Sequence, residues 1–322
     1  MSDLNSLAPD NRDLSMFPGE YGLPFLGKTV EFVKDTLAMC NKHYEKYGPI
    51  SRLDMVKNQR VLMCLGPEFN EATLFDPKGN FSVAGGYASS LGGLYPDGML
   101  TRDDVKHKRT RRASQPAFKN DALKTYVDML IPIQERRIQD LPVNEEFIFY
   151  DNIQKTLMDV AARVFIGLDE LSPEAKKLGH LFSEINEGLI TPLPYDLPFL
   201  QFRKSLKARE ELRQFFIENI PKRRGSNGLD MFTRYCNAKD EDGEYLDDID
   251  IDGHIAFLLF AAFDTTTSAL TNILYYLGKN PEWQDKVRNE IFSVTNEMPT
   301  FEDLAEMNLT EYVFQETLRF YP

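Results

Sequence analysis

A long apolar segment begins at Asp250 or Asp252 and runs to Lys279, where Asn280-Pro281 ends it. Its length and its flanking residues predict one helix of roughly 40 Å, which is long enough to span a whole domain. The longest uninterrupted apolar run, from Ile255 to Phe263, is short compared with the roughly 20 residues that cross a bilayer, so no transmembrane span is expected.

Polar side chains interrupt this apolar helix at Asp264, Thr265, Thr266, Thr267 and Ser268. Buried polar groups cost free energy unless they find partners, so the interruption needs a reason. In one interpretation the hydroxyls bond back to carbonyls one turn earlier and only bend the helix. In the other they form a functional site, and this segment alone does not separate the two.

The remaining pattern predicts a fold that is mainly α with a small β-sheet. A helix is expected from about Thr29 to Tyr47, followed by two strands, Ile50–Met55 and Arg60–Leu65, around a polar turn at residues 57–59. From Asp103 onward the chain is expected to be helical for most of its length.

We expect one domain over residues 1–322, comprising a lead-in and Pro-rich hinge (1–28), a helix, small sheet and Gly-rich loop (29–100), and a helical body (101–322). The Gly-rich residues 84–100 are unusually apolar, which favours a loop that lines a ligand cavity over a plain surface connection. The segment Thr191–Pro198 is either a lid over a lipophilic site or a packed connector.

Composition excludes several classes of protein. Hydrophobic residues at 42% and charged residues at 27% are typical of a globular chain, and a net charge of −13 makes nucleic acid a poor partner. Cys40, Cys64 and Cys236 lie far apart, without the spacing of a disulfide framework or a zinc site. With no signal peptide visible, a reducing cytoplasm is the expected location.

Two charged pairs have helical spacing. Glu316 and Arg319 lie three residues apart among apolar neighbours, which predicts a largely buried ion pair, although surface pairs at this spacing are common. His107 and Arg111 lie one turn apart, so both can direct donors at one anionic group. The alternative for this basic segment, residues 106–112, is a solvated cationic face.

The order of these motifs resembles that of the cytochrome P450 family. Residues 17–24 resemble its proline-rich hinge, and His107-x-x-x-Arg111 resembles its haem-propionate clamp. The sequence Ala-Ala-Phe-Asp-Thr-Thr at 261–266 resembles its oxygen-activating motif, with Ala262 where many members have glycine, and Glu-Thr-Leu-Arg at 316–319 resembles its Glu-x-x-Arg signature.

The resemblance implies a haem-dependent monooxygenase that inserts one oxygen atom of O2 into an apolar substrate. Asp264 and Thr265 would relay protons to the bound dioxygen. Ala261, Ala262 and Thr265 would lie against the haem, with Ala262 small enough to leave room for oxygen. His107 and Arg111 would pair with the propionates, and Glu316 with Arg319 would hold the scaffold. A ferredoxin or a reductase would supply electrons, and residues 22–27 are most similar to the branch that hydroxylates retinoids and related terpenoids.

The family's Phe-x-x-Gly-x-Arg-x-Cys-x-Gly loop, which supplies the axial thiolate, does not occur in residues 1–322. We therefore expect no metal ligand in this chain, and we expect a polypeptide of these residues alone to hold haem poorly and to be inactive. The competing hypothesis is a non-enzymatic truncated fragment or a helical remnant kept for interactions.

Overall fold

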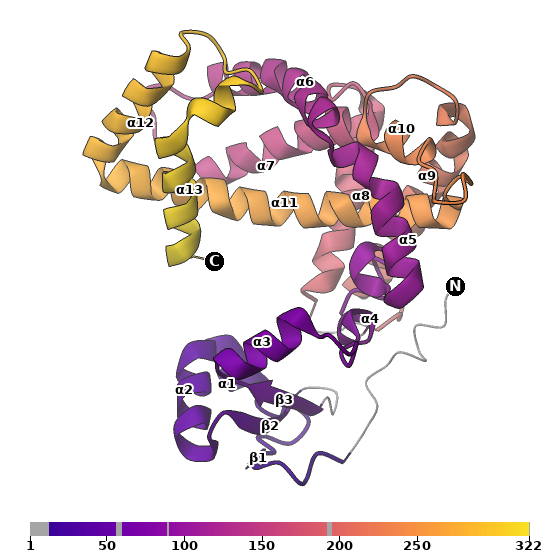
Figure 1. The fold of residues 1–322 in the computed structure, drawn as a ribbon, viewed down its shortest axis with the longest axis vertical. Coiled ribbons are helices and arrows are strands. Elements are labelled where there is room, and N and C mark those ends of the chain that lie inside the picture. Colours follow the sequence, from indigo (N-terminus) through magenta and orange to yellow (C-terminus); the bar gives the residue numbers. More distant parts are fainter. Residues whose placement is uncertain (1–12, 56–59, 89, 192–194, 322) are drawn as a thin grey trace. The chain divides into compact units, whose positions relative to one another are not determined.

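The computed structural model describes residues 13–55, 60–88, 90–191 and 195–321, and the chain forms two compact units, residues 1–89 and 90–322 (Figure 1). The boundary between the two units, after residue 89, lies inside the Gly-rich segment 84–100. The expected division of a single domain after residues 28 and 100 stays a prediction.

The smaller unit contains a three-stranded sheet in the order β1-β2-β3. Strand β1 (Gly19–Glu20) is parallel to β2 (Ile50–Asp54), which pairs antiparallel with β3 (Arg60–Cys64) so that Ile50 lies opposite Cys64. The two long strands were expected within one residue of these bounds, because period-2 runs on either side of a polar turn are typical of a hairpin. The turn at 57–59 lies outside the described residues.

The helix expected from Thr29 to Tyr47 is in fact two helices, α1 (Thr29–Lys34) and α2 (Thr36–Tyr47). Asp35 separates them with an extended backbone, and its carboxylate caps α2 by accepting a hydrogen bond of 2.8 Å from the amide of Ala38. An Asp at this position satisfies a helix N-terminal amide that would otherwise lack a partner. The unit ends with α3 (Pro67–Phe75) and α4 (Val83–Tyr87).

In the described residues of the larger unit the regular secondary structure is helical, apart from one isolated bridge between Lys239 and Tyr245. Two short 3-10 turns, η3 (Met99–Thr101) and η4 (Gln115–Phe118), flank α5 (Asp104–Ser114). The longer helices are α6 (Asn120–Gln139), α7 (Phe149–Val160) with a π-helical end η5 (Ala161–Ile166), α8 (Pro173–Leu189), α9 (Gln201–Arg223), α10 (Met231–Cys236), α11 (Asp248–Lys279), α12 (Pro281–Val294) and α13 (Asn308–Phe320), with η6 (Asp303–Glu306) before the last.

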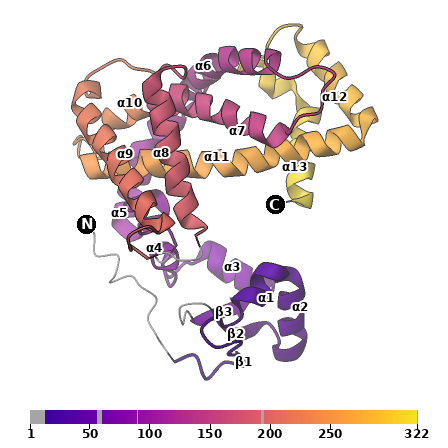
Figure 2. The same cartoon turned by 180° about the vertical axis from the view of Figure 1, so that it is seen from behind.

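Helix α11 confirms the expectation of one continuous long helix. Its 32 residues give a length of about 48 Å at the standard rise, and both views show it crossing the helical unit from end to end (Figure 1, Figure 2). Its N-terminal half is the centre of the core, where Ile251, Ile255 and Ala256 are fully buried. The helices α7, α9, α10 and α13 pack along it.

Within the described ranges, α11 is also the one helix long and apolar enough to cross a membrane by length and composition. The uninterrupted apolar run in the sequence, from Ile255 to Phe263, is shorter than α11 because Asp264 interrupts it. The burial of Ile251 to Leu259 among other helices is what the core helix of a folded domain shows. The expected absence of a membrane span stays a prediction.

The Gly-rich loop is better packed than its composition indicated. Leu91, Leu94 and Tyr95 are buried in the core of the larger unit, and the ring of Tyr95 stacks on Phe260 of α11 with centroids 4.7 Å apart. The Tyr95 hydroxyl donates a hydrogen bond of 2.5 Å to Asn186 of α8. The proposed lid at 191–198 lies partly outside the described residues, at 192–194.

Candidate active site

The hydroxyls in the polar segment of α11 bond to carbonyls one turn earlier in the same helix, as in the interpretation in which they only bend the helix. Thr265 Oγ1 donates to the carbonyl of Ala261 at 2.7 Å, and Thr267 Oγ1 donates to the carbonyl of Phe263 at 2.9 Å. These bonds satisfy the hydroxyls without another element, which is how a run of Thr is accommodated inside an apolar helix. They do not exclude function, because Thr265 is exposed and its oxygen keeps an acceptor site.

Asp264 lies beside Thr265 and is exposed, while Ala261 and Ala262 are half-buried one turn earlier on α11. Loss of water around its carboxylate raises the pKa of Asp264. Asp264 lies close enough to Tyr95 to help raise the pKa of that phenol, although burial of Tyr95 is the larger cause. A carboxyl with a raised pKa releases and takes up a proton more readily near neutral pH, which suits a proton-relay group.

Helix α5 carries the two residues of the expected anion clamp. His107 is half-buried and Arg111 is exposed, one turn apart on the same helix. Arg111 borders a cavity. The two residues share a helix face, and their expected pairing with the haem propionates stays a prediction.

The cavity beside Arg111 has a volume of about 560 Å³. Its remaining lining residues come from η3, α5, η4 and its flank, α10 and α11, and they are Met99, Ser114, Gln115, Phe118, Lys119, Tyr235, His254, Phe257 and Leu258. Sequence reasoning missed His254, which is 1% exposed and has an Nε2 atom without a hydrogen-bond partner. A lone His on an apolar helix carries no motif that would mark it.

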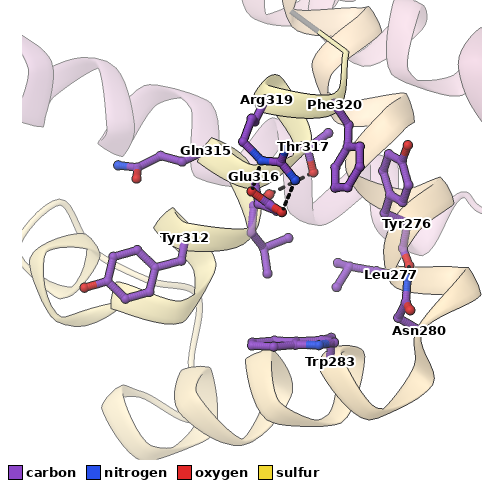
Figure 3. A pocket seen from close by; sticks show the side chains of 11 residues that line it. Tyr276, Leu277, Asn280, Trp283, Tyr312, Gln315, Glu316, Thr317, Arg319 and Phe320 are labelled. Atoms are coloured by element: carbon purple, nitrogen blue, oxygen red, sulfur yellow. Dashed lines mark hydrogen bonds and ion pairs between the residues drawn. The ribbon is translucent and has the colours of Figure 1, made fainter.

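Glu316 and Arg319 form the expected pair, but the expectation that the pair is buried is wrong. Arg319 donates from Nε at 2.7 Å and from Nη2 at 2.8 Å to the two carboxylate oxygens of Glu316, while their side chains are 64% and 56% exposed (Figure 3). Within the described part of the chain, the main neighbours of α13 are α11 and α12, and Thr317 is the residue that it buries. The apolar flanking residues Phe314 and Phe320 are themselves exposed.

The pair lines a groove of about 660 Å³ between α11, α12 and α13. Its walls are formed by aromatic and polar side chains, including Tyr276, Trp283, Tyr312 and Phe320 (Figure 3). The rings of Tyr276 and Phe320 lie 5.5 Å apart and join α13 to α11. Hydrogen bonds from Arg319 hold the pKa of Glu316 below its usual range.

The three thiols lie apart from these groups. Burial raises the pKa of Cys236 to about 12 and also raises that of Cys64, and Cys40 lies 3.5 Å from the sulfur of Met63. Thiols with raised pKa values are poor metal ligands at neutral pH.

The family model for cytochrome P450 matches residues 17–322. The chain therefore belongs to the cytochrome P450 family, in agreement with its mainly helical fold, its small sheet and the motifs on α5, α11 and α13.

Known proteins of the family resemble the chain along most of its length. It is 28% identical to cytochrome P450 136 of Mycobacterium tuberculosis over 97% of this chain and 64% of that protein. It is 26% identical to the taxoid 14-beta-hydroxylase of Taxus cuspidata over 95% of this chain and 63% of that protein. A solved structure of a cyanobacterial CYP120A1 bound to retinoic acid matches with a TM-score of 0.79 and 27% identity, over 94% of this chain and 69% of that one. The chain thus spans under two thirds of the length of these two curated relatives.

Haem is the cofactor that the family implies, and the cavity beside Arg111 has chemistry that fits one edge of it. Apolar walls from Met99, Phe257 and Leu258 suit a porphyrin ring, and Arg111 suits a carboxylate. The residues present therefore fit a planar apolar group with an anionic edge.

Proposed function

We propose that the whole protein is a haem-dependent monooxygenase that inserts one oxygen atom of O2 into an apolar isoprenoid-like substrate. The observation that carries this proposal is that α11 bears Asp264 and Thr265 and, closer to its N-terminus, contributes Phe257 and Leu258 to a cavity that suits a haem edge. When bound, haem supplies the redox chemistry that activates O2. Among the known relatives, one is named for a taxoid and one is bound to retinoic acid. A fatty-acid-like substrate is the alternative within the same chemistry.

The chain's own residues would have three tasks. Arg111 would bind a propionate, since a guanidinium is a strong donor to carboxylates. The Thr265 hydroxyl would turn away from the Ala261 carbonyl, to which it donates in the structure, and donate its one proton from Oγ1, and the Asp264 carboxyl would resupply that proton. Tyr95, held by Asn186 over Phe260, would close an apolar site against water.

Electrons would come from an acidic ferredoxin or a reductase that docks on α5. Lys106 and Lys108 are exposed there, whereas Arg109 and Arg112 already contact Asp240 and Glu241. The uncompensated lysines would therefore attract an acidic partner in a protein of net charge −13. A cytoplasmic location would suit such a partner.

Turnover tests this proposal. Haem-loaded protein that carries the family's cysteine loop would be supplied with a ferredoxin system and offered retinoic acid, a taxane diterpene and dodecanoate in parallel. We expect hydroxylated product from an isoprenoid at a higher kcat/KM than from dodecanoate. The absence of oxygenated product from every substrate, with the haem intact, would contradict the proposed reaction.

We further propose that the polypeptide of residues 1–322 alone does not hold haem stably, which is the expectation for a non-enzymatic fragment. The exposure of Asp264, Thr265, Glu316 and Arg319 supports this proposal. The test is reconstitution with haem, followed by reduction and carbon monoxide. A thiolate-type Soret band would contradict it and would direct attention to Cys40, Cys64 and Cys236.

A further inference from the structure

A small cavity lies in the core of the larger unit. Its volume is about 20 Å³, and its walls come from α7, η5, α8, α9 and α11. None of the residues described as lining it also lines the groove at α13 or the cavity beside Arg111. The lining residues Ala162, Ile166 and Leu212 are at most 6% exposed, so this space is internal.

The size and the walls of this cavity select its occupant. One water molecule needs roughly 10–15 Å³, so a cavity of 20 Å³ admits one small molecule and excludes larger ones. A buried water also needs about two to four polar partners, and none of the side chains described as lining this cavity is polar. Apolar cavities in proteins stay dry and take up apolar guests. The class of ligand that fits is therefore a diatomic apolar gas.

Gly179 of α8 helps to keep this space open. Its φ lies outside the left-handed region, so the backbone does not require glycine there, and alanine is the better helix former. A Cβ at this position would lie 3.1 Å from the sulfur of Met158 on α7, and both residues line the cavity. A side chain at 179 would therefore crowd the cavity wall.

The π-helical turn η5 forms another wall. Ala161, Ala162 and Ile166 of this turn line the cavity. Turns of π-helix are rare, and they are found frequently at functional sites. The irregular backbone at this wall therefore agrees with a binding role for the cavity.

The wall from α11 places the cavity behind the polar segment of that helix. Leu259 and Phe263 line it from one helix face, since they are four residues apart. The ring of Phe263 packs edge-on against that of Phe182 on α8, with centroids 5.5 Å apart. Phe263 directly precedes Asp264, and Thr265 lies on the opposite face because successive helical residues are about 100° apart.

We propose that this cavity is an internal binding site for dioxygen, behind the segment of α11 that carries Asp264 and Thr265. The choice of dioxygen rests on the proposed function, because O2 is the apolar gas that the reaction consumes. Binding of an apolar gas to these walls does not depend on that function. The site holds the gas and is not the place where it reacts, since Thr265 lies on the other face of the helix. Dispersion contacts alone hold the ligand, so we expect weak binding that is measurable under oxygen pressure.

Paramagnetic relaxation tests the site, because dissolved O2 is paramagnetic and N2, an apolar gas of similar size, is not. The 1–322 chain would be labelled at its methionine and leucine methyl groups and measured by nuclear magnetic resonance under each gas. We expect O2 to relax the methyl groups of Met158 and Leu259 severalfold more than that of Met231. Met231 is the control because it is 4% exposed and is not among the residues described as lining the cavity.

Gly179→Ala is the test variant, and Gly278→Ala on α11 is the matched control, because a Cβ at 278 meets no atom within 4 Å. Both changes introduce the better helix former, so both variants should fold. We expect Gly179→Ala to weaken oxygen binding about tenfold, because crowding a packed wall is unfavourable, and Gly278→Ala to leave it within about twofold. The dependence of relaxation on oxygen pressure gives both affinities. Ala162→Val narrows the same space from η5 if Met158 moves aside in the first variant.

The outcomes are separable. Equal relaxation at Met158, Leu259 and Met231 would overturn the site. An enhancement that survives both Gly179→Ala and Ala162→Val, or that Gly278→Ala reduces equally, would also overturn it. Magnetisation transfer from water to the Met158 methyl group would show a hydrated cavity and would reject an apolar-gas site. These measurements need no haem, so gas binding combined with no oxygenated product in the turnover test would contradict the proposed reaction and support the cavity as an apolar-gas site.

Discussion

Arg209 of α9 donates to both carboxylate oxygens of Asp252 on α11, with distances of 2.9 Å and 2.7 Å, and both side chains are at least 95% buried. The pair holds α9 against the N-terminal half of α11. Asp252 lies two residues before His254 on that helix. Buried ion pairs do not necessarily add stability, but removing one partner leaves an uncompensated charge in the core.

We therefore expect Asp252→Asn to lower the free energy of unfolding by about 3 kcal/mol, because Arg209 stays charged and loses its counter-ion. Arg213 offers the matched control, since its Nε lies 3.9 Å from the same carboxylate and its side chain is 40% exposed. Arg213→Gln should change the free energy by less than about 1 kcal/mol. Urea unfolding measures both, and equal effects would show that the buried geometry does not matter.

Acid should destabilise the fold through His254. Burial lowers the pKa of His254 from its ordinary value of 6.5 to about 3 in the folded chain, so protons favour the unfolded state. The contribution is fully present above pH 6.5 and is lost progressively as the pH falls toward 3, by up to about 1.4 kcal/mol per pH unit. We expect His254→Gln to reduce the slope of unfolding free energy against pH in this window, and His180→Gln to leave it unchanged. Parallel slopes for wild type and His254→Gln would contradict the burial of a neutral ring.

Thr265 should matter for the use of oxygen more than for substrate binding. In haem-loaded protein with the family's cysteine loop, Thr265→Ala is expected to lower product formed per electron consumed by at least about tenfold, with peroxide released instead. Thr271→Ala is the control, because Thr271 makes the same helix-internal bond, at 2.7 Å to Thr267, outside the motif. Unchanged coupling in Thr265→Ala would show that its hydroxyl serves only the helix.

The salt dependence of reduction should identify the cations that meet the electron donor. Arg109 donates to one oxygen of Asp240 from Nε at 2.8 Å and from Nη2 at 2.7 Å, and Arg112 contacts Glu241 at 2.5 Å. Lys108→Glu should therefore slow reduction by an acidic ferredoxin roughly fivefold at low salt, and Arg112→Gln should have a smaller effect. Stopped-flow reduction rates that do not fall with ionic strength would reject electrostatic steering.

The sequence predicted the parts of this fold that depend on local pattern. The long helix and the strand pair at 50–54 and 60–64 follow from periodicity and turn residues. The helix-internal bonds of Thr265 and Thr267 match one of the two interpretations that the sequence left open. The break at Asp35 was missed, because one cap inside an otherwise helical pattern is a weak signal.

The sequence was less informative wherever burial depends on distant segments. Apolar neighbours of Glu316 and Arg319 indicated a buried pair, yet the surfaces around them are open in the described structure. His254 was not found, since its partners Tyr235 and Arg102 come from other parts of the chain. Helix spacing placed His107 and Arg111 on one face of α5, but it could not predict the cavity that Arg111 borders, because the other walls of that cavity come from other elements.

The central claim is that this chain contributes its Asp264 and Thr265 to oxygen insertion at a haem, and isotopic labelling tests it most directly. A chimera would join residues 1–321 to the C-terminal part of the CYP120A1 relative that the match does not cover, be loaded with haem, and turn over retinoic acid under ¹⁸O₂. The account predicts one ¹⁸O atom in the hydroxylated product and the other in water, with Thr265→Ala lowering the labelled yield. Product oxygen derived from water, or no product from a chimera with an intact haem-thiolate spectrum, would contradict it.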